Sequence, residues 1–100
     1  MTTLYMIELA LPDPITPEFM ELIPKNMEVT NKLLSEGKIQ YYTVSLERSR
    51  VWMVVEAESE FDAEAVLADL PLSPYMTPTF FPIMFHRNAT NITFPAISLN

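Results

Sequence analysis

The sequence predicts a single α+β domain in which two helices back one sheet of four strands. Apolar, β-branched runs and two segments of helical periodicity alternate in the order strand, helix, strand, strand, helix, strand. Both helical segments begin with recognisable capping residues. Pro74, Pro78 and Pro82 near the last strand share one parity, so their missing N–H groups lie along one side and predict an edge strand.

The first strand is expected from Leu4 to Leu11, with Glu8 as its only charge. Thr16 is a predicted N-cap, with Pro17 at the first helical position. One helical face is then expected to be buried through residues at steps of three and four, namely Phe19, Ile23, Met27, Thr30 and Leu34.

Two residues punctuate this first helix. Pro24 lacks an N–H, so we expect it to kink the helix or to leave the first turn loosely joined. Gly37 is the only glycine of the chain, and we expect it to end the helix with a left-handed backbone conformation.

A hairpin is expected from Ile39–Leu46 and Arg50–Ala57, which are rich in Val, Tyr, Thr and Trp. Because side chains alternate along a strand, two sets in its second strand point to opposite faces. The first set is Val51, Met53 and Val55, and the second is Trp52, Val54 and Glu56.

Ser59 caps the second predicted helix, with Asp62 three residues on. Its predicted buried stripe consists of Phe61, Ala65, Val66 and Leu70. Pro71 and Pro74 then forbid further helix, and an extended run is expected from Tyr75 to Phe85.

This order of elements is the ferredoxin-like βαββαβ pattern with a four-stranded antiparallel sheet, in which the last strand lies at an edge beside the first. We expect the domain to span residues 1–86. Residues 87–100 form a C-terminal tail with apolar Ile92, Phe94 and Ile97, which we expect to pack on a neighbouring subunit.

Composition excludes several classes of protein. A net charge of −7 with six scattered basic residues argues against a nucleic-acid partner. No apolar segment approaches the ~20 residues of a membrane span, and no signal peptide is recognisable. The absence of cysteine fits a cytoplasmic location. A hydrophobic content of 49% is high for so small a domain, which predicts a homodimer or a higher homo-oligomer.

Several short motifs together resemble the muconolactone isomerase-like family of dimeric α+β barrels. The most specific is the run from Leu70 to Met76, Leu-Pro-Leu-Ser-Pro-Tyr-Met. Weaker matches are Glu8, Leu11-Pro12, Gly37-Lys38, Arg48, Glu58, Pro82 and His86. The resemblance implies a ferredoxin-like monomer whose sheet pairs with that of a second copy. It also implies proton transfer within an unsaturated lactone, without a metal or an organic cofactor.

The sequence departs from this family in the first helix. The isomerases carry a dense run of Lys, Arg and Glu there, whereas this chain reads Ile23-Pro24-Lys25-Asn26-Met27-Glu28. Only Lys25 keeps a cation at a comparable place, and Asn26 stands where the neighbouring acid is expected. Met6 likewise stands where the first strand of the isomerases carries a cation.

Proton abstraction beside a carbonyl needs a base of tuned pKa and a cation or donor for the enolate. Glu8 is the predicted base, because a lone acid in an apolar strand would have a raised pKa. The alternative is that Glu8 pairs across a subunit interface or faces solvent. Lys25 is the predicted anion holder, on one helical face with Glu28 and Lys32. Such sets are most often solvated surface pairs.

Tyr42 and Trp52 are predicted to shape an aromatic cavity between sheet and helices, although such residues are more often core or interface. Glu28 and His86 are further candidates for substrate binding. His86 is the sole histidine, so no metal site can be built on paired imidazoles. Arg48 is expected to serve the hairpin turn or an intersubunit salt bridge.

The first functional hypothesis is therefore an isomerase acting on a small, mostly apolar organic acid or lactone. A second is a non-catalytic oligomeric module that binds a small molecule or builds an assembly. A third is a cofactor-free oxygenase of the same barrel superfamily.

Overall fold

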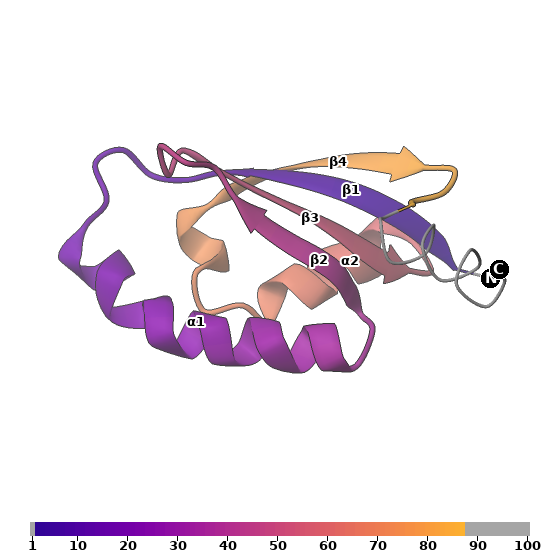
Figure 1. The fold of residues 1–100 in the computed structure, drawn as a ribbon, viewed down its shortest axis with the longest axis horizontal. Helices are drawn as coiled ribbons and strands as arrows, with labels where there is room; N and C mark the ends of the chain where they lie inside the picture. Colours follow the sequence, from indigo (N-terminus) through magenta and orange to yellow (C-terminus); the bar gives the residue numbers. More distant parts are fainter. Residues whose placement is uncertain (1, 88–100) are drawn as a thin grey trace, which may run out of the picture.

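The computed structural model describes residues 2–87 of the chain. One antiparallel sheet with the strand order β2-β3-β1-β4 forms one layer, and both helices cover the same face of it (Figure 1). The elements are β1 (Thr3–Ala10), α1 (Pro17–Ser35), β2 (Ile39–Val44), β3 (Arg50–Ala57), α2 (Glu60–Ala68), the 3₁₀ turn η1 (Ser73–Tyr75) and β4 (Thr77–Ile83). The expected order and ferredoxin-like topology are confirmed.

The edge position of β4 is also confirmed, since among the strands of residues 2–87 β4 pairs with β1 alone. Pro78 lies opposite Leu9, and Pro82 opposite Tyr5. Their shared parity places both missing N–H groups on the same side of β4, which suits an edge. The strand is shorter than the predicted Tyr75–Phe85 run, because Pro74 lies in η1, whose tight turn suits a fixed φ near −65°.

Both ends of α1 follow the sequence signals. The Phe19 N–H donates to the Thr16 hydroxyl oxygen at 3.2 Å. At the other end Gly37 has φ +76°, and the N–H groups of Gly37 and Lys38 donate to the carbonyls of Leu34 and Leu33. This pair of bonds is a Schellman helix end. The helix runs on through Pro24, so the proline does not divide α1 into two helices.

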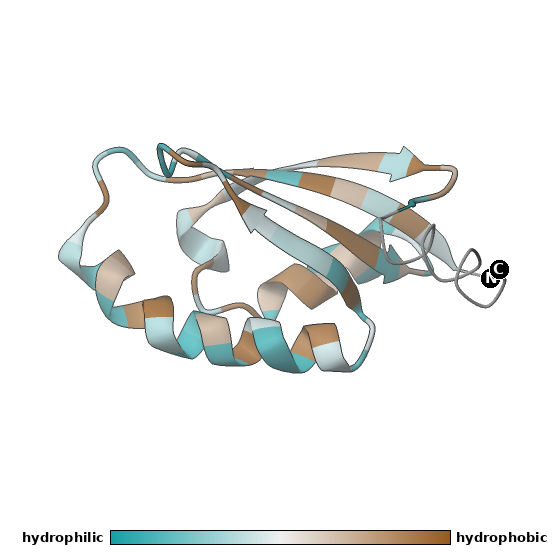
Figure 2. Ribbon diagram, in the orientation of Figure 1, coloured by the Kyte–Doolittle hydropathy of each residue, from teal (hydrophilic) through white to brown (hydrophobic). Residues whose placement is uncertain are grey.

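The predicted buried faces of the helices were partly wrong. In α1 the buried residues are Phe19, Asn26, Thr30 and Leu33, whereas Ile23 and Met27 lie at the edge of the contact and are exposed. In α2 the buried residues are Ala63 and Leu67, continued by Leu70, whereas Phe61 is 78% exposed and Ala65 is exposed too. The predicted helical period was right in each helix. The buried face lies at a different angle around the helix axis, because that angle depends on how the helix packs on the sheet. Figure 2 shows hydrophilic and hydrophobic residues interspersed along α1.

The core lies between the sheet and the helices. The inner face of the sheet contributes the alternate residues Tyr5, Ile7 and Leu9 from β1 and Val51, Met53, Val55 and Ala57 from β3. The predicted two-sided division of β3 is thus confirmed, and the intervening residues of β1 and β3 form an outer face that no helix covers. Neither helix of the described residues combines the length and hydrophobicity needed to cross a bilayer.

The left-handed backbone at Gly37 yields a stability prediction. A β-carbon at Gly37 would meet no atom within 4 Å, so only the backbone conformation opposes a side chain there. We expect Gly37→Ala to lower the free energy of unfolding by about 1 kcal/mol, and Gly37→Asn by less, since Asn tolerates this conformation better. Urea denaturation measures both, and equal losses in the two variants would contradict the explanation.

Candidate functional site

A cavity of about 220 Å³ lies between α1 and the inner face of the sheet, near the β2–β3 hairpin. Eight of its eleven lining residues are apolar and three are polar. The apolar residues are Leu11, Ile15, Phe19, Ile23, Met27, Val44, Val51 and Leu72, and the polar ones are Asn26, Tyr42 and Arg48. An apolar space with a few polar groups is the usual form of a small-molecule site.

Asn26 links three elements at the inner wall of this cavity. The Leu72 backbone N–H donates to Asn26 Oδ1 at 3.1 Å, which ties the segment after α2 to α1. Asn26 Nδ2 donates to the Tyr42 hydroxyl oxygen of β2 at 3.4 Å. The Thr30 hydroxyl donates to the Asn26 carbonyl at 2.7 Å one turn on. These bonds satisfy polar groups that would otherwise be buried at a cost.

Tyr42 carries the hydroxyl of the cavity. Burial raises the pKa of Tyr42 above its ordinary value, and the hydrogen bond from Asn26 offsets part of this rise. The phenol is therefore neutral at physiological pH and keeps a proton to donate. This arrangement can hold a carbonyl or carboxylate oxygen of a ligand.

Arg48 lines the cavity from the hairpin turn and is exposed. Its φ of +63° places it in the left-handed region, where a non-glycine residue is uncommon. No salt bridge to Arg48 is found within residues 2–87. Its guanidinium is thus available to an anionic group of a ligand.

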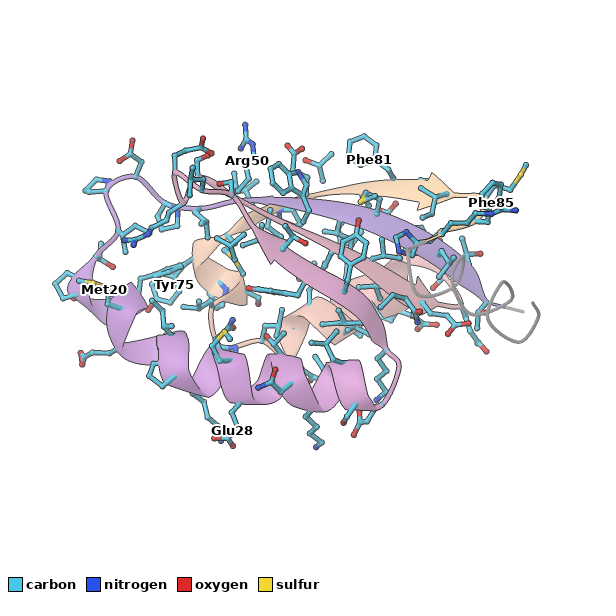
Figure 3. The ribbon with its side chains drawn as sticks, in the orientation of Figure 1. Met20, Glu28, Arg50, Tyr75, Phe81 and Phe85 are labelled. Carbon is cyan, nitrogen blue, oxygen red and sulfur yellow. The ribbon has the colours of Figure 1, made fainter. Side chains whose placement is uncertain are left out.

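The predicted base Glu8 lies outside this cavity, on the outer face of the sheet. Trp52 Nε1 donates to Glu8 Oε1 at 3.2 Å, and Arg50 Nε lies 3.4 Å from Glu8 Oε2. Trp52 therefore shapes the outer face and not the cavity. The reason is strand alternation: Ile7 and Leu9 point inward, so Glu8 between them points outward. Figure 3 shows Arg50 and Phe81 on this side of the sheet, away from the helices.

The predicted cation Lys25 lies on the opposite side of the molecule from Glu8. Lys25 Nζ forms a salt bridge with Glu28 Oε1 at 3.0 Å, and both side chains are largely exposed. Figure 3 shows Glu28 on the side of α1 that faces away from the sheet. The expected convergence of Glu8 and Lys25 on one pocket is therefore wrong within a single chain, because the sheet and α1 lie between them.

The remaining candidates divide between the two faces. Tyr42 lines the cavity, as predicted. His86 packs against Tyr41 with ring centroids 4.8 Å apart and ring planes inclined by 57°, and the Tyr41 hydroxyl donates to Met6 Sδ at 3.6 Å. Since Tyr41 and Tyr42 are adjacent in β2, they face opposite ways, so His86 belongs to the outer face. Within residues 2–87 no cluster of three or more Asp, Glu or His side chains could hold a metal ion.

Sequence reasoning missed Asn26 and Arg48 as cavity residues. A signal for Asn26 was present, because Phe19, Asn26, Thr30 and Leu33 recur at steps that keep one helical face, and a polar residue on such a face is notable. Arg48 gave no comparable signal, since its approach to the cavity depends on the twist of the hairpin.

The strand order and the placement of both helices on one face define a ferredoxin-like α+β protein, which has a cavity between the sheet and α1. A family model described as muconolactone delta-isomerase matches residues 3–89, and the chain belongs to this family. The resemblance stated from the sequence is thereby confirmed.

Comparison with solved structures supports the fold. A crystal structure of muconolactone isomerase at 3.3 Å resolution matches with a TM-score of 0.67 and 21% sequence identity, over 86% of this chain and 93% of the other. Comparison with curated proteins gave no match.

The raised pKa of Tyr42 predicts a pH dependence of stability. Folding favours the neutral phenol, so this contribution is complete below the unfolded pKa of about 10 and is lost as the pH rises through the higher folded pKa. We expect the free energy of unfolding to fall more steeply above pH 10 in the wild type than in Tyr42→Phe. Urea denaturation between pH 8 and pH 11 provides the comparison; parallel curves would contradict it.

Proposed function

We propose that this chain is a cofactor-free isomerase that binds a small, mostly apolar lactone or organic acid in the sheet–helix cavity. Membership of the muconolactone delta-isomerase family supports the reaction. The observation that carries the choice of site is that Tyr42 and Arg48 both line one cavity whose other lining residues, apart from Asn26, are apolar. Such a cavity matches a substrate with an apolar ring and oxygen atoms at its ends.

In the proposed reaction a proton leaves the carbon beside a carbonyl, and the C–H electron pair forms an enolate. The enolate is reprotonated at another carbon, so a double bond shifts and the composition of the substrate is unchanged. Tyr42 would donate to the carbonyl oxygen, where negative charge develops. Arg48 would pair with a carboxylate of the substrate and fix its orientation.

The lining of the cavity does not supply the base that removes this proton. None of the eleven cavity-lining residues is an acid or a histidine. The predicted base Glu8 would meet a substrate only at the outer face of the sheet, where a second copy could enclose it. Lys25 and Glu28 would need a neighbouring subunit to reach a substrate bound there, whereas His86 already lies on that face.

The absence of an acid or histidine from the cavity lining favours a second candidate function, a non-catalytic module that binds the same class of ligand. Isomerisation and binding can be separated in one experiment, because proton transfer in heavy water leaves deuterium in the lactone. Muconolactone is the probe, since the family is described by its isomerisation.

We expect Met27→Trp to weaken muconolactone binding about tenfold, because the larger ring enters the cavity that Met27 lines. Met20→Trp is the matched control, since Met20 lies on the same helix, is similarly exposed and does not line the cavity. Isothermal titration calorimetry measures both affinities. Equal affinities in the two variants, or no binding by the wild type, would reject this cavity as the site.

The same proteins decide between catalysis and binding. Deuterium incorporation, followed by NMR, identifies an isomerase, whereas binding without incorporation identifies a binding module. Glu8→Gln tests the predicted base in this assay. Loss of turnover with retained fold and binding would support its role, and unchanged turnover would remove Glu8 from the mechanism.

We further propose that the chain forms a homodimer through the outer face of its sheet, where Met6, Trp52 and Phe81 are partly exposed. Phe81→Asp is expected to yield a monomer by light scattering at micromolar concentration, because it buries a charge in the interface. Phe61→Asp is the matched control, because Phe61 is an exposed residue of α2, and this variant should stay dimeric. A monomeric wild type would refute the proposal.

A further inference from the structure

The Tyr42 hydroxyl is held on one side only. Asn26 Nδ2 donates to its oxygen at 3.4 Å, and this is the one hydrogen bond that the hydroxyl makes to protein groups of residues 2–87. Both residues line the cavity. The direction of the remaining O–H bond therefore determines what the polar end of the cavity offers to a ligand.

The orientation of the Asn26 amide is fixed by its other partner. The Leu72 backbone N–H can only donate, so the group of Asn26 that faces it must be the carbonyl oxygen Oδ1, at 3.1 Å. The NH₂ group is then the group that faces Tyr42. Asn26 is buried, with a relative exposure of 2%, so water does not compete for these positions.

The orientation of the Asn26 amide decides in which direction the Tyr42 O–H bond points. A phenol hydrogen prefers the plane of the ring, on one side of the oxygen or the other. Asn26 occupies one side with its own donor, and two facing donors repel each other, so the hydroxyl hydrogen turns to the other side. No acceptor from the described residues meets it there, and the cavity borders Tyr42.

We propose that Asn26 is a positioning residue that turns the Tyr42 hydroxyl hydrogen into the cavity, so that the site selects ligands presenting a carbonyl or carboxylate oxygen. This inference rests on the proposed function, because it concerns the same cavity. It goes beyond that function because it states that the Tyr42 hydroxyl can only donate a hydrogen bond to a ligand. Ligands that present only a donor to Tyr42 are disfavoured, because two donors then face each other.

Asn26→Asp tests the inference with almost no change of shape. A carboxylate still accepts from the Leu72 N–H, so the tie between α1 and the segment after α2 is kept. It also accepts from Tyr42, which turns the hydroxyl hydrogen out of the cavity. At pH 8 we expect the affinity for muconolactone to fall about tenfold, measured by calorimetry.

A double-mutant cycle shows whether Asn26 acts through Tyr42. In a Tyr42→Phe background, Asn26→Asp should lower the affinity for muconolactone by clearly less than in the wild type, because only the charge of the carboxylate still acts and no hydroxyl is left to turn. An equal loss of affinity in both backgrounds would overturn the inference, since Asn26 would then act on the ligand or on the fold directly.

A measurement without ligand separates this inference from the proposed function. The pKa of Tyr42 can be followed by NMR with ¹³Cζ-labelled tyrosine. A carboxylate that accepts the hydroxyl proton stabilises the neutral phenol, so Asn26→Asp should raise the pKa of Tyr42. An unchanged pKa overturns the inference. If wild type fails to bind muconolactone, the proposed substrate is wrong, and this pKa still decides the role of Asn26.

Asn26→Ser serves if Asn26→Asp does not fold. The shorter side chain cannot reach Tyr42, so the donated hydrogen bond is lost and the pKa of Tyr42 should again rise. A purely structural tie to Leu72 would leave this pKa unchanged, and that result would overturn the inference.

Discussion

The packing of both helices on one face of the sheet is the constraint on which the rest of the structure depends. The strands β1 and β3 present alternate residues to that face. A residue of β1 or β3 therefore belongs either to the core or to the outer face, and one step along the strand changes its environment. Ile7 lies in the core and Glu8, its neighbour, lies on the outer face with Trp52 and Arg50.

This division separates the chemistry of the molecule into two regions. The inner region has an apolar cavity with a neutral phenol, a buried amide and an arginine at its edge. The outer region has a carboxylate held by an indole N–H and a guanidinium, together with exposed aromatic side chains. The inner region contains the cavity of about 220 Å³ with a mostly apolar lining, and so it carries the proposed site. The outer region suits contact with a second copy.

Asn26 connects the fold to the site. Its amide satisfies the buried Leu72 N–H and fixes where the polar group of β2 meets the cavity. The resemblance to the isomerases places an acid near this position. An amide in its place retains a hydrogen-bond acceptor for Leu72, gains a donor for Tyr42 and has no negative charge.

The local elements were predictable because their signals are local. The starts of the two helices are marked by the side-chain oxygens of Thr16 and Ser59, which accept from nearby N–H groups. The end of α1 is marked by the left-handed backbone of Gly37. The prolines of β4 lack N–H groups on one side of the strand, and such a strand fits only at the edge of a sheet. The rotation of the helices was less accessible: Ile23 and Met27 have the right period, but they lie at the rim of the cavity and not in the core.

The sequence by itself determined the order of the elements, the ends of α1, the start of α2, the edge position of β4 and the family, because hydrogen bonding, backbone geometry and side-chain alternation act over a few residues. Only the tertiary structure decided which side of the sheet the helices cover. That choice placed Glu8 and Lys25 on opposite sides of the molecule and brought Asn26, Tyr42 and Arg48 to one cavity. The physical reason is that these groups lie far apart along the chain and meet only through the packing of α1 against the sheet.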